Sequence, residues 1–331
     1  MRGGDRQLRL IMLGAAAAAL GVAGCRAAET PPPRVTAAAA TSLATQSVVS
    51  ELQDAKRSKL LTIRVTYPQA PGRYPLIVFS HGAGGSGDNY LELTRHWAEH
   101  GYVVVQPTHI DSRRALGRMP GPDELSRWGE RPLDVSLVLD SLDTVEQRLG
   151  IVGRIDRERI GVGGHSMGAQ TSQLIGGVLP GSATPYARTR FRDERADAIL
   201  VLSGQGAGRE FDERSWKGLL PPMLVITGTN DTSVSAGRDS NWRREPFDRA
   251  PPGSKYLLFI DGAYHGFGGI SGARSAGANA GPPNPAHVAM VKASTLRFWD
   301  AYLKGDKAAM QALGTDRIAA EWGGQATMAS K

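Results

Sequence analysis

The 331-residue sequence contains a single cysteine, Cys25, so no disulfide can form within the chain. It also lacks the Cys/His spacings that bind zinc, and it has no internal repeat. Lysine and arginine give a formal net charge of +7, but these residues are scattered and form no basic stripe interleaved with aromatic residues. The sequence therefore argues against a zinc module, a repeat architecture and a nucleic-acid partner.

No apolar run is long enough to cross a membrane comfortably, which takes about 20 residues. The run from Leu10 to Ala23 is shorter, rich in alanine and preceded by three arginines within residues 1–10. It ends in Val-Ala-Gly-Cys at Cys25, which resembles the lipobox of bacterial lipoproteins. We expect residues 1–24 to be a lipoprotein signal peptide and Cys25 to carry lipid, which places the protein in the bacterial cell envelope, facing the periplasm or the cell surface. An ordinary cleaved signal with an incidental cysteine is the alternative.

The next segment, residues 25–50, is rich in alanine, threonine, proline and serine and has no periodic apolar pattern until Val48. This composition predicts a flexible tether. Residues 51–331 are then expected to fold as one domain, because α/β domains of this length commonly share a single core.

Short apolar runs alternate with helical patterns along this domain, which predicts an α/β fold with a mostly parallel sheet. The predicted strands are 60–66, at an edge, and 76–80, 102–106, 159–162, 198–202, 223–227 and 255–260. The predicted helices are 89–100, 131–149, 288–303 and one beginning at about Ser166. Irregular segments are expected to surround a site at the carboxyl ends of the strands, namely 111–130, 182–195, 205–221 and 268–285.

One pentapeptide has the Gly-x-Ser-x-Gly pattern: Gly164-His165-Ser166-Met167-Gly168. Alone it is weak evidence in a chain with 41 glycines. However, an apolar strand precedes it and a helix-compatible stretch follows, so it predicts a sharp strand-to-helix turn that exposes the Ser166 hydroxyl. Gly164 and Gly168 are needed there because side chains would collide with neighbouring backbone.

A serine nucleophile needs a base to accept its proton and a carboxylate to orient that base. After such a turn the expected chain order is serine, acid, histidine. Asp231 follows the predicted strand 223–227, and His265 follows the predicted strand 255–260. We therefore expect a catalytic triad of Ser166, Asp231 and His265.

Competing residues are less well placed for these two roles. Asp261 is the rival acid, but it lies only four residues before His265. The remaining histidines precede or adjoin the serine, lie in a predicted helix, or begin the last helix; they are His81, His96, His100, His109, His165 and His287.

The tetrahedral intermediate of acyl transfer carries an oxyanion, which needs hydrogen-bond donors fixed in advance. The first donor is expected to be the N–H of Met167, directly after the nucleophile. The second should come from the glycine-rich loop at residues 80–85, where we expect the N–H of Ala83. A plain glycine-rich turn is the alternative interpretation of this loop.

Taken together, these motifs resemble the α/β-hydrolase fold, and within it the bacterial branch near platelet-activating-factor acetylhydrolase and dienelactone hydrolase. The resemblance covers residues 52–310 and rests on the runs 78–82, 131–134, 138–140, 155–168 and 298–303. It implies a sheet of about eight strands with helices on both faces, and hydrolysis of an acyl ester without metal or organic cofactor. The nucleophile is serine rather than cysteine, which argues against the dienelactone substrate. Polyester-degrading hydrolases share the Gly-His-Ser-Met-Gly turn, so a polymeric ester stays open.

The wall of the substrate pocket is harder to predict. Trp128 and Met119 could line an acyl pocket or pack beneath its rim, and His109 could shape the pocket or make a structural hydrogen bond. Arg131 and Asp134, three residues apart at a predicted helix start, are expected to form an ordinary ion pair.

These observations predict a serine hydrolase that cleaves carboxylic esters through an acyl-enzyme intermediate. Its expected partners are an ester substrate, whether small molecule, lipid or polyester, and a membrane reached through the lipid anchor. An amidase or peptidase with the same triad is one alternative, although no extra domain selects peptides. A non-catalytic envelope lipoprotein that uses the scaffold for binding is another, because fold alone does not guarantee activity.

Overall fold

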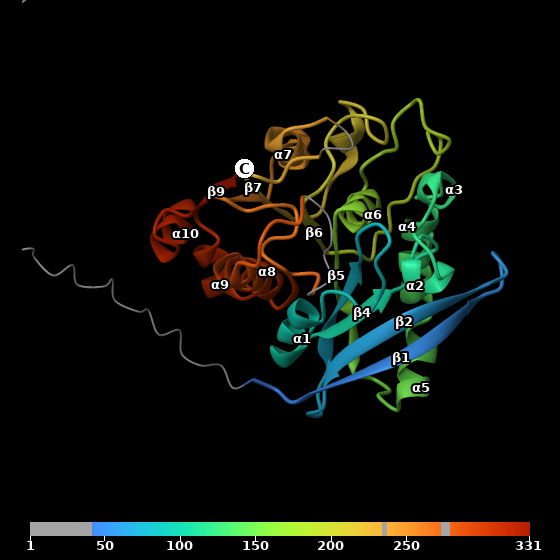
Figure 1. Ribbon diagram of the computed structural model, residues 1–331. Helices are drawn as coiled ribbons and strands as arrows, with labels where there is room; N and C mark the ends of the chain where they lie inside the picture. The colour runs from blue at the N-terminus through green and yellow to red at the C-terminus, as the bar shows by residue number, and fades with distance from the viewer. Residues whose placement is uncertain (1–41, 234–236, 273–278) are drawn as a thin grey trace, which may run out of the picture. The chain divides into compact units, whose positions relative to one another are not determined.

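A nine-stranded sheet runs through the computed structural model, which describes residues 42–233, 237–272 and 279–331 (Figure 1). The strand order is β1-β2-β4-β3-β5-β6-β7-β8-β9. Neighbours from β4 to β8 are parallel, whereas β1 with β2, β2 with β4, and β8 with β9 are antiparallel. The strands are β1 Thr45–Asp54, β2 Lys59–Pro68, β3 Tyr74–Ser80, β4 Val103–Pro107, β5 Ile155–His165, β6 Ala198–Leu202, β7 Met223–Gly228, β8 Lys255–Ile260 and β9 Ala326–Ser330.

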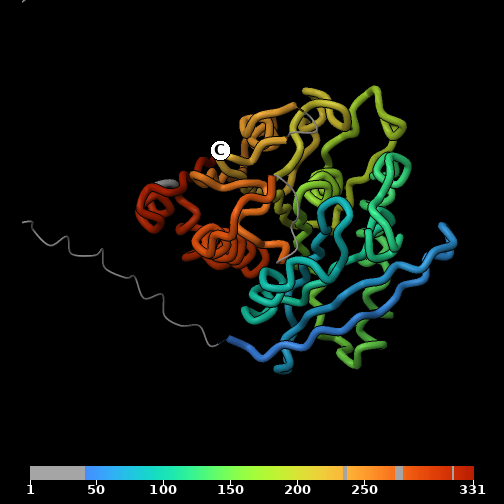
Figure 2. Tube along the Cα trace, in the orientation of Figure 1, coloured from blue at the N-terminus to red at the C-terminus, as the bar shows by residue number. Residues whose placement is uncertain are grey.

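Two hydrophobic layers cover the two faces of this sheet, because successive side chains of a strand point to opposite sides. In β3, Leu76 and Val78 pack in the layer with α4 to α7, whereas Ile77 and Phe79 pack in the layer with α1, α8 and α10. Figure 2 shows the path of the Cα trace in the same orientation as Figure 1. The helices are α1 Leu91–Glu99, α2 Arg113–Leu116, α3 Pro122–Ser126, α4 Glu130–Asp140, α5 Leu142–Leu149, α6 Met167–Ile175, the 3-10 helix η1 Ser215–Gly218, α7 Ser240–Arg249, α8 Pro285–Leu303, α9 Lys307–Ala312 and α10 Thr315–Glu321.

The predicted α/β architecture, with a mostly parallel sheet and helices on both faces, is confirmed. Each of the seven predicted strands is present, but the sheet has nine strands rather than about eight. The predicted edge position of strand 60–66 is wrong, because β1 pairs along β2 from Thr45 opposite Pro68 to Asp54 opposite Lys59.

The tether predicted for residues 25–50 is too long by six residues, because Thr45–Ser50 belong to β1. Most of the side chains in β1 are exposed or half-buried, so this strand shows little apolar pattern. It is held mainly by its backbone pairing with β2, which composition does not reveal. The predicted signal peptide 1–24, Cys25 and the predicted tether as far as residue 41 lie outside the described residues.

The single helix predicted over 131–149 is two helices, α4 and α5, which meet at Ser141. The backbone of Ser141 has φ −108° and ψ 14°, outside the helical range, so the helix breaks there. Gly150 then ends α5 in the left-handed conformation at φ 66°, as the glycine predicted. No helix in the described part of the chain combines the length and the apolar character that a membrane crossing requires.

Candidate active site

The turn between β5 and α6 holds Ser166 in a strained conformation, with φ 56° and ψ −120°. For a residue other than glycine such a backbone costs about 1–3 kcal/mol, which the surrounding structure must supply. A Cβ atom on Gly164 would lie 2.2 Å from the backbone of Gly168, and one on Gly168 would lie 2.0 Å from the carbonyl oxygen of Ser80. Both positions therefore require glycine, for the steric reason expected from the sequence.

The side chains of Ser166, His265 and Asp231 form one line of hydrogen bonds. The Oγ atom of Ser166 lies 3.0 Å from Nε2 of His265, and Nδ1 of His265 lies 2.9 Å from Oδ1 of Asp231. The carboxylate can only accept, so Nδ1 carries the proton and Nε2 is left to accept the proton of the serine hydroxyl. Asp231 lies in the loop after β7 and His265 in the loop after β8, where the sequence predicted them.

Asp231 is completely buried, and its carboxylate accepts further hydrogen bonds from Ser203 Oγ at 2.9 Å and Thr227 Oγ1 at 2.8 Å. Burial by itself would raise the pKa of Asp231, but the bond with His265 and the charge of Arg243 bring that pKa down to about 2. The acid is therefore ionised at neutral pH and fixed in orientation. The rival, Asp261, is exposed and accepts a hydrogen bond from Thr229 at 3.2 Å.

Two residues that sequence reasoning missed complete this end of the site. Ser203 follows β6 with φ 52°, and its Oγ atom lies 2.5 Å from Nδ1 of His265. Arg243 of α7 is buried, donates to the backbone oxygens of Ser203 and Gly204 at 3.1 and 3.3 Å, and has Nε 3.4 Å from Asp231. The end of a central strand was a usable signal for Ser203, whereas the sequence around Arg243 carries none.

Four successive N–H groups of the loop after β3 show which of them is free to bind substrate. Gly82 donates to the Tyr90 hydroxyl at 3.2 Å, Gly84 to Asp111 at 3.1 Å, and Gly85 to the oxygen of Gly82 at 3.1 Å. Only the N–H of Ala83 has no acceptor in the part of the chain that the structure describes.

The loop passes close to Ser166. A Cβ atom on Gly82 would lie 3.4 Å from the Cβ atom of Ser166. The N–H of Met167 likewise has no protein acceptor among the described residues. Both predicted oxyanion donors are therefore unoccupied N–H groups beside Ser166.

A hydrogen-bonded chain joins this loop to the loop of His265. The Tyr90 hydroxyl, which accepts from Gly82, lies 2.9 Å from Nδ1 of His165, and Nε2 of His165 lies 2.8 Å from the backbone oxygen of His265. The carbonyl can only accept, so Nε2 of His165 carries the proton and Nδ1 accepts from Tyr90. Burial and the nearby His265 lower the pKa of His165 to about 3, so it is neutral at ordinary pH.

A pocket of about 330 Å³ opens in front of Ser166. Met119 contributes to its wall, together with Arg113 and Asn279, so two of the irregular segments named from the sequence do rim the site. A second pocket of about 560 Å³ lies against α8 and contains none of the predicted site residues.

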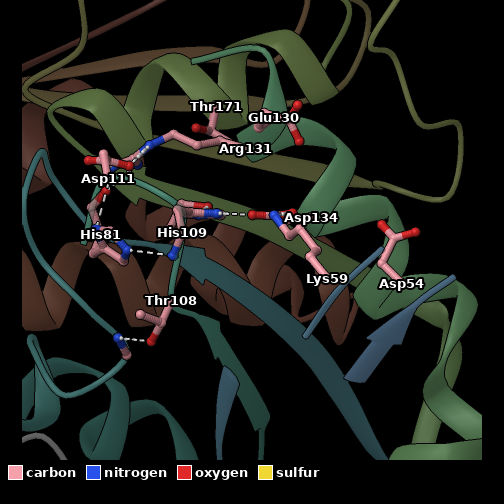
Figure 3. A network of polar contacts seen from close by, with 12 residues as sticks. Asp54, Lys59, His81, Thr108, His109, Asp111, Glu130, Arg131, Asp134 and Thr171 are labelled. Atoms are coloured by element: carbon pink, nitrogen blue, oxygen red, sulfur yellow. Dashed lines mark hydrogen bonds and ion pairs between the residues drawn. The ribbon is translucent and has the colours of Figure 1, made fainter. Parts of the chain in front are cut away.

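Neither His109 nor Trp128 lines the pocket in front of Ser166, so of the alternatives left open by the sequence the structure favours the structural hydrogen bond for His109 and interior packing for Trp128. His109 is completely buried, with Nδ1 2.9 Å from Asp134 and Nε2 3.1 Å from Ser80 Oγ (Figure 3). Trp128 is 7% exposed and packs edge-on against Tyr186, with ring centroids 4.5 Å apart. Both side chains turn into the interior because the packing and hydrogen-bond partners that they need are there.

The expected ion pair between Arg131 and Asp134 is also absent. Figure 3 shows that the two side chains point to different partners. Arg131 pairs with Asp111 at 2.7 Å, whereas Asp134 binds His109 and has an oxygen 2.6 Å from Nζ of Lys59. Spacing along a helix gave the wrong partners because both side chains point into the interior rather than along the helix surface.

The chain is similar to several known ester hydrolases. A family model described as Chlorophyllase matches residues 35–175, less than half of the 331 residues. "Cutinase est2" of Thermobifida alba is 29% identical over 205 residues, which cover 61% of this chain and 56% of the relative. "Cutinase 2" of Thermobifida cellulosilytica is 27% identical, covering 61% of this chain and 64% of that protein. "Chlorophyllase-1, chloroplastic" of Citrus sinensis is 28% identical over 111 residues, 33% of this chain and 30% of that protein.

The strand order, the turn at Ser166 and these similarities agree. The fold is that of an α/β hydrolase. The match spans 56% of the length of one of these cutinases and 64% of the other. Its matches are to cutinases and chlorophyllases, and the narrower resemblance to the acetylhydrolase and dienelactone hydrolase branch stays a prediction.

Proposed function

We propose that this protein is a serine esterase that hydrolyses carboxylic esters through an acyl-enzyme intermediate. The observation that carries the proposal is the hydrogen-bonded line from Ser166 through His265 to buried Asp231, beside the free N–H groups of Ala83 and Met167. The similarity to cutinases and chlorophyllases supports the same reaction class.

In the proposed reaction, Nε2 of His265 takes the hydroxyl proton of Ser166 while Oγ attacks the carbonyl carbon of the ester. The N–H groups of Ala83 and Met167 donate to the oxyanion of the tetrahedral intermediate. When this intermediate collapses, the carbon–oxygen bond to the alcohol breaks and His265 gives the alcohol its proton. Water then attacks the acyl-enzyme by the same steps and releases the acid and Ser166.

The residues around Asp231 suit this sequence of proton transfers. A carboxylate that is ionised and held by Ser203 and Thr227 keeps Nδ1 of His265 protonated and favours the imidazolium that forms when Ser166 loses its proton. Because these donors are fixed before the reaction, no reorganisation is needed as charge develops.

Turnover of a series of p-nitrophenyl esters from acetate to decanoate, with the Ser166→Ala variant beside the wild type, tests the proposal. We expect a chain-length optimum set by the pocket of about 330 Å³, and loss of turnover in the variant. Covalent labelling of the wild type by a fluorophosphonate, absent in Ser166→Ala, would identify the nucleophile. Folded wild-type protein that neither turns over any ester nor reacts with the probe would instead support the non-catalytic binding role.

The same triad could cleave amides, so the reaction class needs its own comparison. We expect p-nitrophenyl butyrate to be cleaved much faster than the matching p-nitroanilide, since cutinases and chlorophyllases are the relatives found. Equal or faster anilide cleavage would favour the amidase alternative.

We also propose, from the sequence alone, that the protein is exported and anchored by lipid on Cys25. Cells that express it would incorporate labelled palmitate into the wild type, whereas Cys25→Ser would remain unlabelled. Equal labelling of the two would contradict the proposal.

A further inference from the structure

Three hydrogen-bond donors hold the peptide group between Gly82 and Ala83 through its carbonyl oxygen. The oxygen of Gly82 lies 2.6 Å from Nδ1 of His81, and it accepts from the N–H of Gly85 at 3.1 Å and from Nη2 of Arg131 at 3.3 Å. This carbonyl belongs to the same peptide group as the N–H of Ala83, the expected oxyanion donor.

A trans peptide group is planar, and its C=O and N–H bonds point in opposite directions. Because the oxygen of Gly82 points inward to Arg131, the N–H of Ala83 must point away from Arg131. A rotation of this peptide would present the carbonyl oxygen in place of the N–H and would break all three hydrogen bonds to Gly82. An oxygen in that position would repel the oxyanion instead of stabilising it.

Arg131 itself is fixed by an ion pair with Asp111 (Figure 3). Both side chains are only 1% exposed. Its Nε and Nη2 atoms donate to Asp111 at 2.9 and 2.7 Å, and its Nη1 donates to the oxygen of His81 at 2.7 Å. The same Asp111 carboxylate accepts the N–H of Gly84 at 3.1 Å. Arg131 and Asp111 therefore bind the backbone on both sides of Ala83, and neither residue lines the pocket.

The third contact depends on the tautomer of His81. Nε2 of His81 lies 3.0 Å from the backbone N–H of His109, which can only donate, so Nε2 accepts and Nδ1 carries the proton. The Nδ1–H group can then donate to the oxygen of Gly82, which is the short 2.6 Å contact. Burial and the charge of Arg131 lower the pKa of His81, which keeps it in this neutral form.

Stability alone is a poor reason for such a pair. Replacing a buried ion pair by apolar side chains of similar volume is often neutral or even stabilising. A guanidinium, in contrast, supplies several donors in one plane with fixed directions, which suits it to hold two carbonyl groups and a carboxylate at once.

We propose that Arg131, held by Asp111, is a positioning residue that keeps the Gly82–Ala83 peptide turned so that the N–H of Ala83 can bind the oxyanion. The inference rests on the proposed esterase function, and it adds a residue to that function which touches no substrate. Loss of Arg131 should therefore weaken binding of the transition state and leave ground-state binding nearly unchanged.

The test compares three proteins: wild type, Arg131→Gln, and the double variant Arg131→Met/Asp111→Leu, which leaves no unpaired buried charge. Two quantities are measured on each, namely kcat and KM for a p-nitrophenyl ester and Ki for a trifluoromethyl ketone, which forms an anionic tetrahedral adduct with the serine. We expect kcat to fall about 10²-fold and Ki to rise by a similar factor, as when an oxyanion donor is lost, with KM changed less than about threefold.

Glu146→Gln is the matched control, because Glu146 is a buried acid in an ion pair with Arg157, away from the pocket. It should lower the melting temperature and leave kcat and Ki unchanged. The inference is overturned if the double variant folds and keeps kcat and Ki within about twofold of wild type, or if KM rises as much as Ki. A wild type that hydrolyses no ester and does not bind the ketone would refute the proposed function, and the inference with it.

Discussion

The hydroxyl of Tyr90 lies 2.9 Å from Nδ1 of His165 and so joins the loop after β3 to the turn that carries the nucleophile. Through Nε2 of His165 the connection extends to the backbone oxygen of His265. One phenol group therefore connects the segments that bear the proposed oxyanion donor, the proposed nucleophile and the proposed base. Tyr90 also has φ 61°, a conformation that few non-glycine residues adopt.

Tyr90→Phe should therefore impair catalysis as well as stability. It leaves the N–H of Gly82 and Nδ1 of His165 unpaired in the interior, and each buried unpaired group costs about 1–3 kcal/mol. We expect a lower melting temperature and a kcat reduced about tenfold, measured by thermal unfolding and steady-state kinetics on one ester. Tyr102→Phe is the control, since this buried tyrosine donates to Asp300 instead. Equal loss of kcat in both variants would show a general effect of destabilisation.

The acid of the triad can be identified by comparing two aspartates. Asp231→Asn should lower kcat about 10³-fold or more, because an amide at this position no longer favours the Nδ1-protonated imidazole. Asp261→Asn should keep kcat within about threefold, because a role limited to holding Thr229 in place predicts a small effect. A larger loss for Asp261→Asn than for Asp231→Asn would reverse the assignment.

Adding one methyl group at Gly168, in the turn that holds Ser166, should have a large effect on folding and activity because the space there is already filled. Gly168→Ala would place Cβ 2.0 Å from the carbonyl oxygen of Ser80, which backbone cannot avoid without moving β3 or α6. We expect no soluble, active protein, or one whose kcat falls by more than 10²-fold if it folds, judged by circular dichroism and ester turnover. Gly208→Ala is the matched control, because a Cβ there meets no atom within 4 Å. Normal activity in Gly168→Ala would contradict the geometry of the turn.

The loss of folding stability at acid pH should arise in part from His165. Burial, with His265 nearby, lowers its pKa in the folded protein from 6.5 to about 3, so between these two values the unfolded chain binds a proton that the folded protein does not. Stability is therefore lost as pH falls through this window, with a contribution of about 1.4 kcal/mol per pH unit from this one group. Urea unfolding of His165→Gln should show a shallower fall between about pH 6 and pH 4. An unchanged slope would mean that His165 does not stay neutral when folded.

The charge at the pocket suggests which esters are bound best. Arg113 contributes to the wall, and no Asp or Glu lines the pocket in the part of the chain that the structure describes. We expect an ester with an anionic acyl group to be preferred over a neutral one of equal length. Arg113→Gln should lower kcat/KM for the anionic ester up to about fivefold and leave the neutral ester unaffected.

Salt and a neighbouring arginine provide the controls for this preference. About 0.5 M salt should weaken it, because exposed charges are screened over a few ångströms. Arg118→Gln should not change it, since Arg118 pairs with Glu124 outside the pocket wall. An anionic preference that survives in Arg113→Gln would show that another group is responsible.

The central part of the fold and the positions of the three proposed triad residues could be predicted from the sequence because both have strong local signals. Buried parallel strands are short apolar runs, and Ser166, Asp231 and His265 each lie directly after such a run. The N–H of Ala83 could be anticipated for the same reason, since its loop follows β3 and is rich in glycine.

Elements held by distant partners could not be predicted in this way. β1 depends on backbone pairing with β2, and β9 pairs with β8 from the far end of the chain. The partner of Arg131 is Asp111, 20 residues away and in another segment, rather than Asp134 on the same helix. A buried ion pair of this kind leaves no periodic pattern in the sequence, because it depends on which loops the fold brings together.

The ion pair of Arg131 and Asp111 lies outside the pocket lining, whereas Arg113 of α2, Met119 and residues 279–280 before α8 belong to it. Under the proposed function, the residues that would carry out the reaction and those that would select the substrate thus lie in different parts of the chain. If the pocket-lining segments were exchanged for those of other hydrolases, we expect a change in which esters are accepted. The bond-breaking step itself should be preserved. We therefore expect that variants with new ester specificities can be selected from libraries confined to the pocket-lining segments.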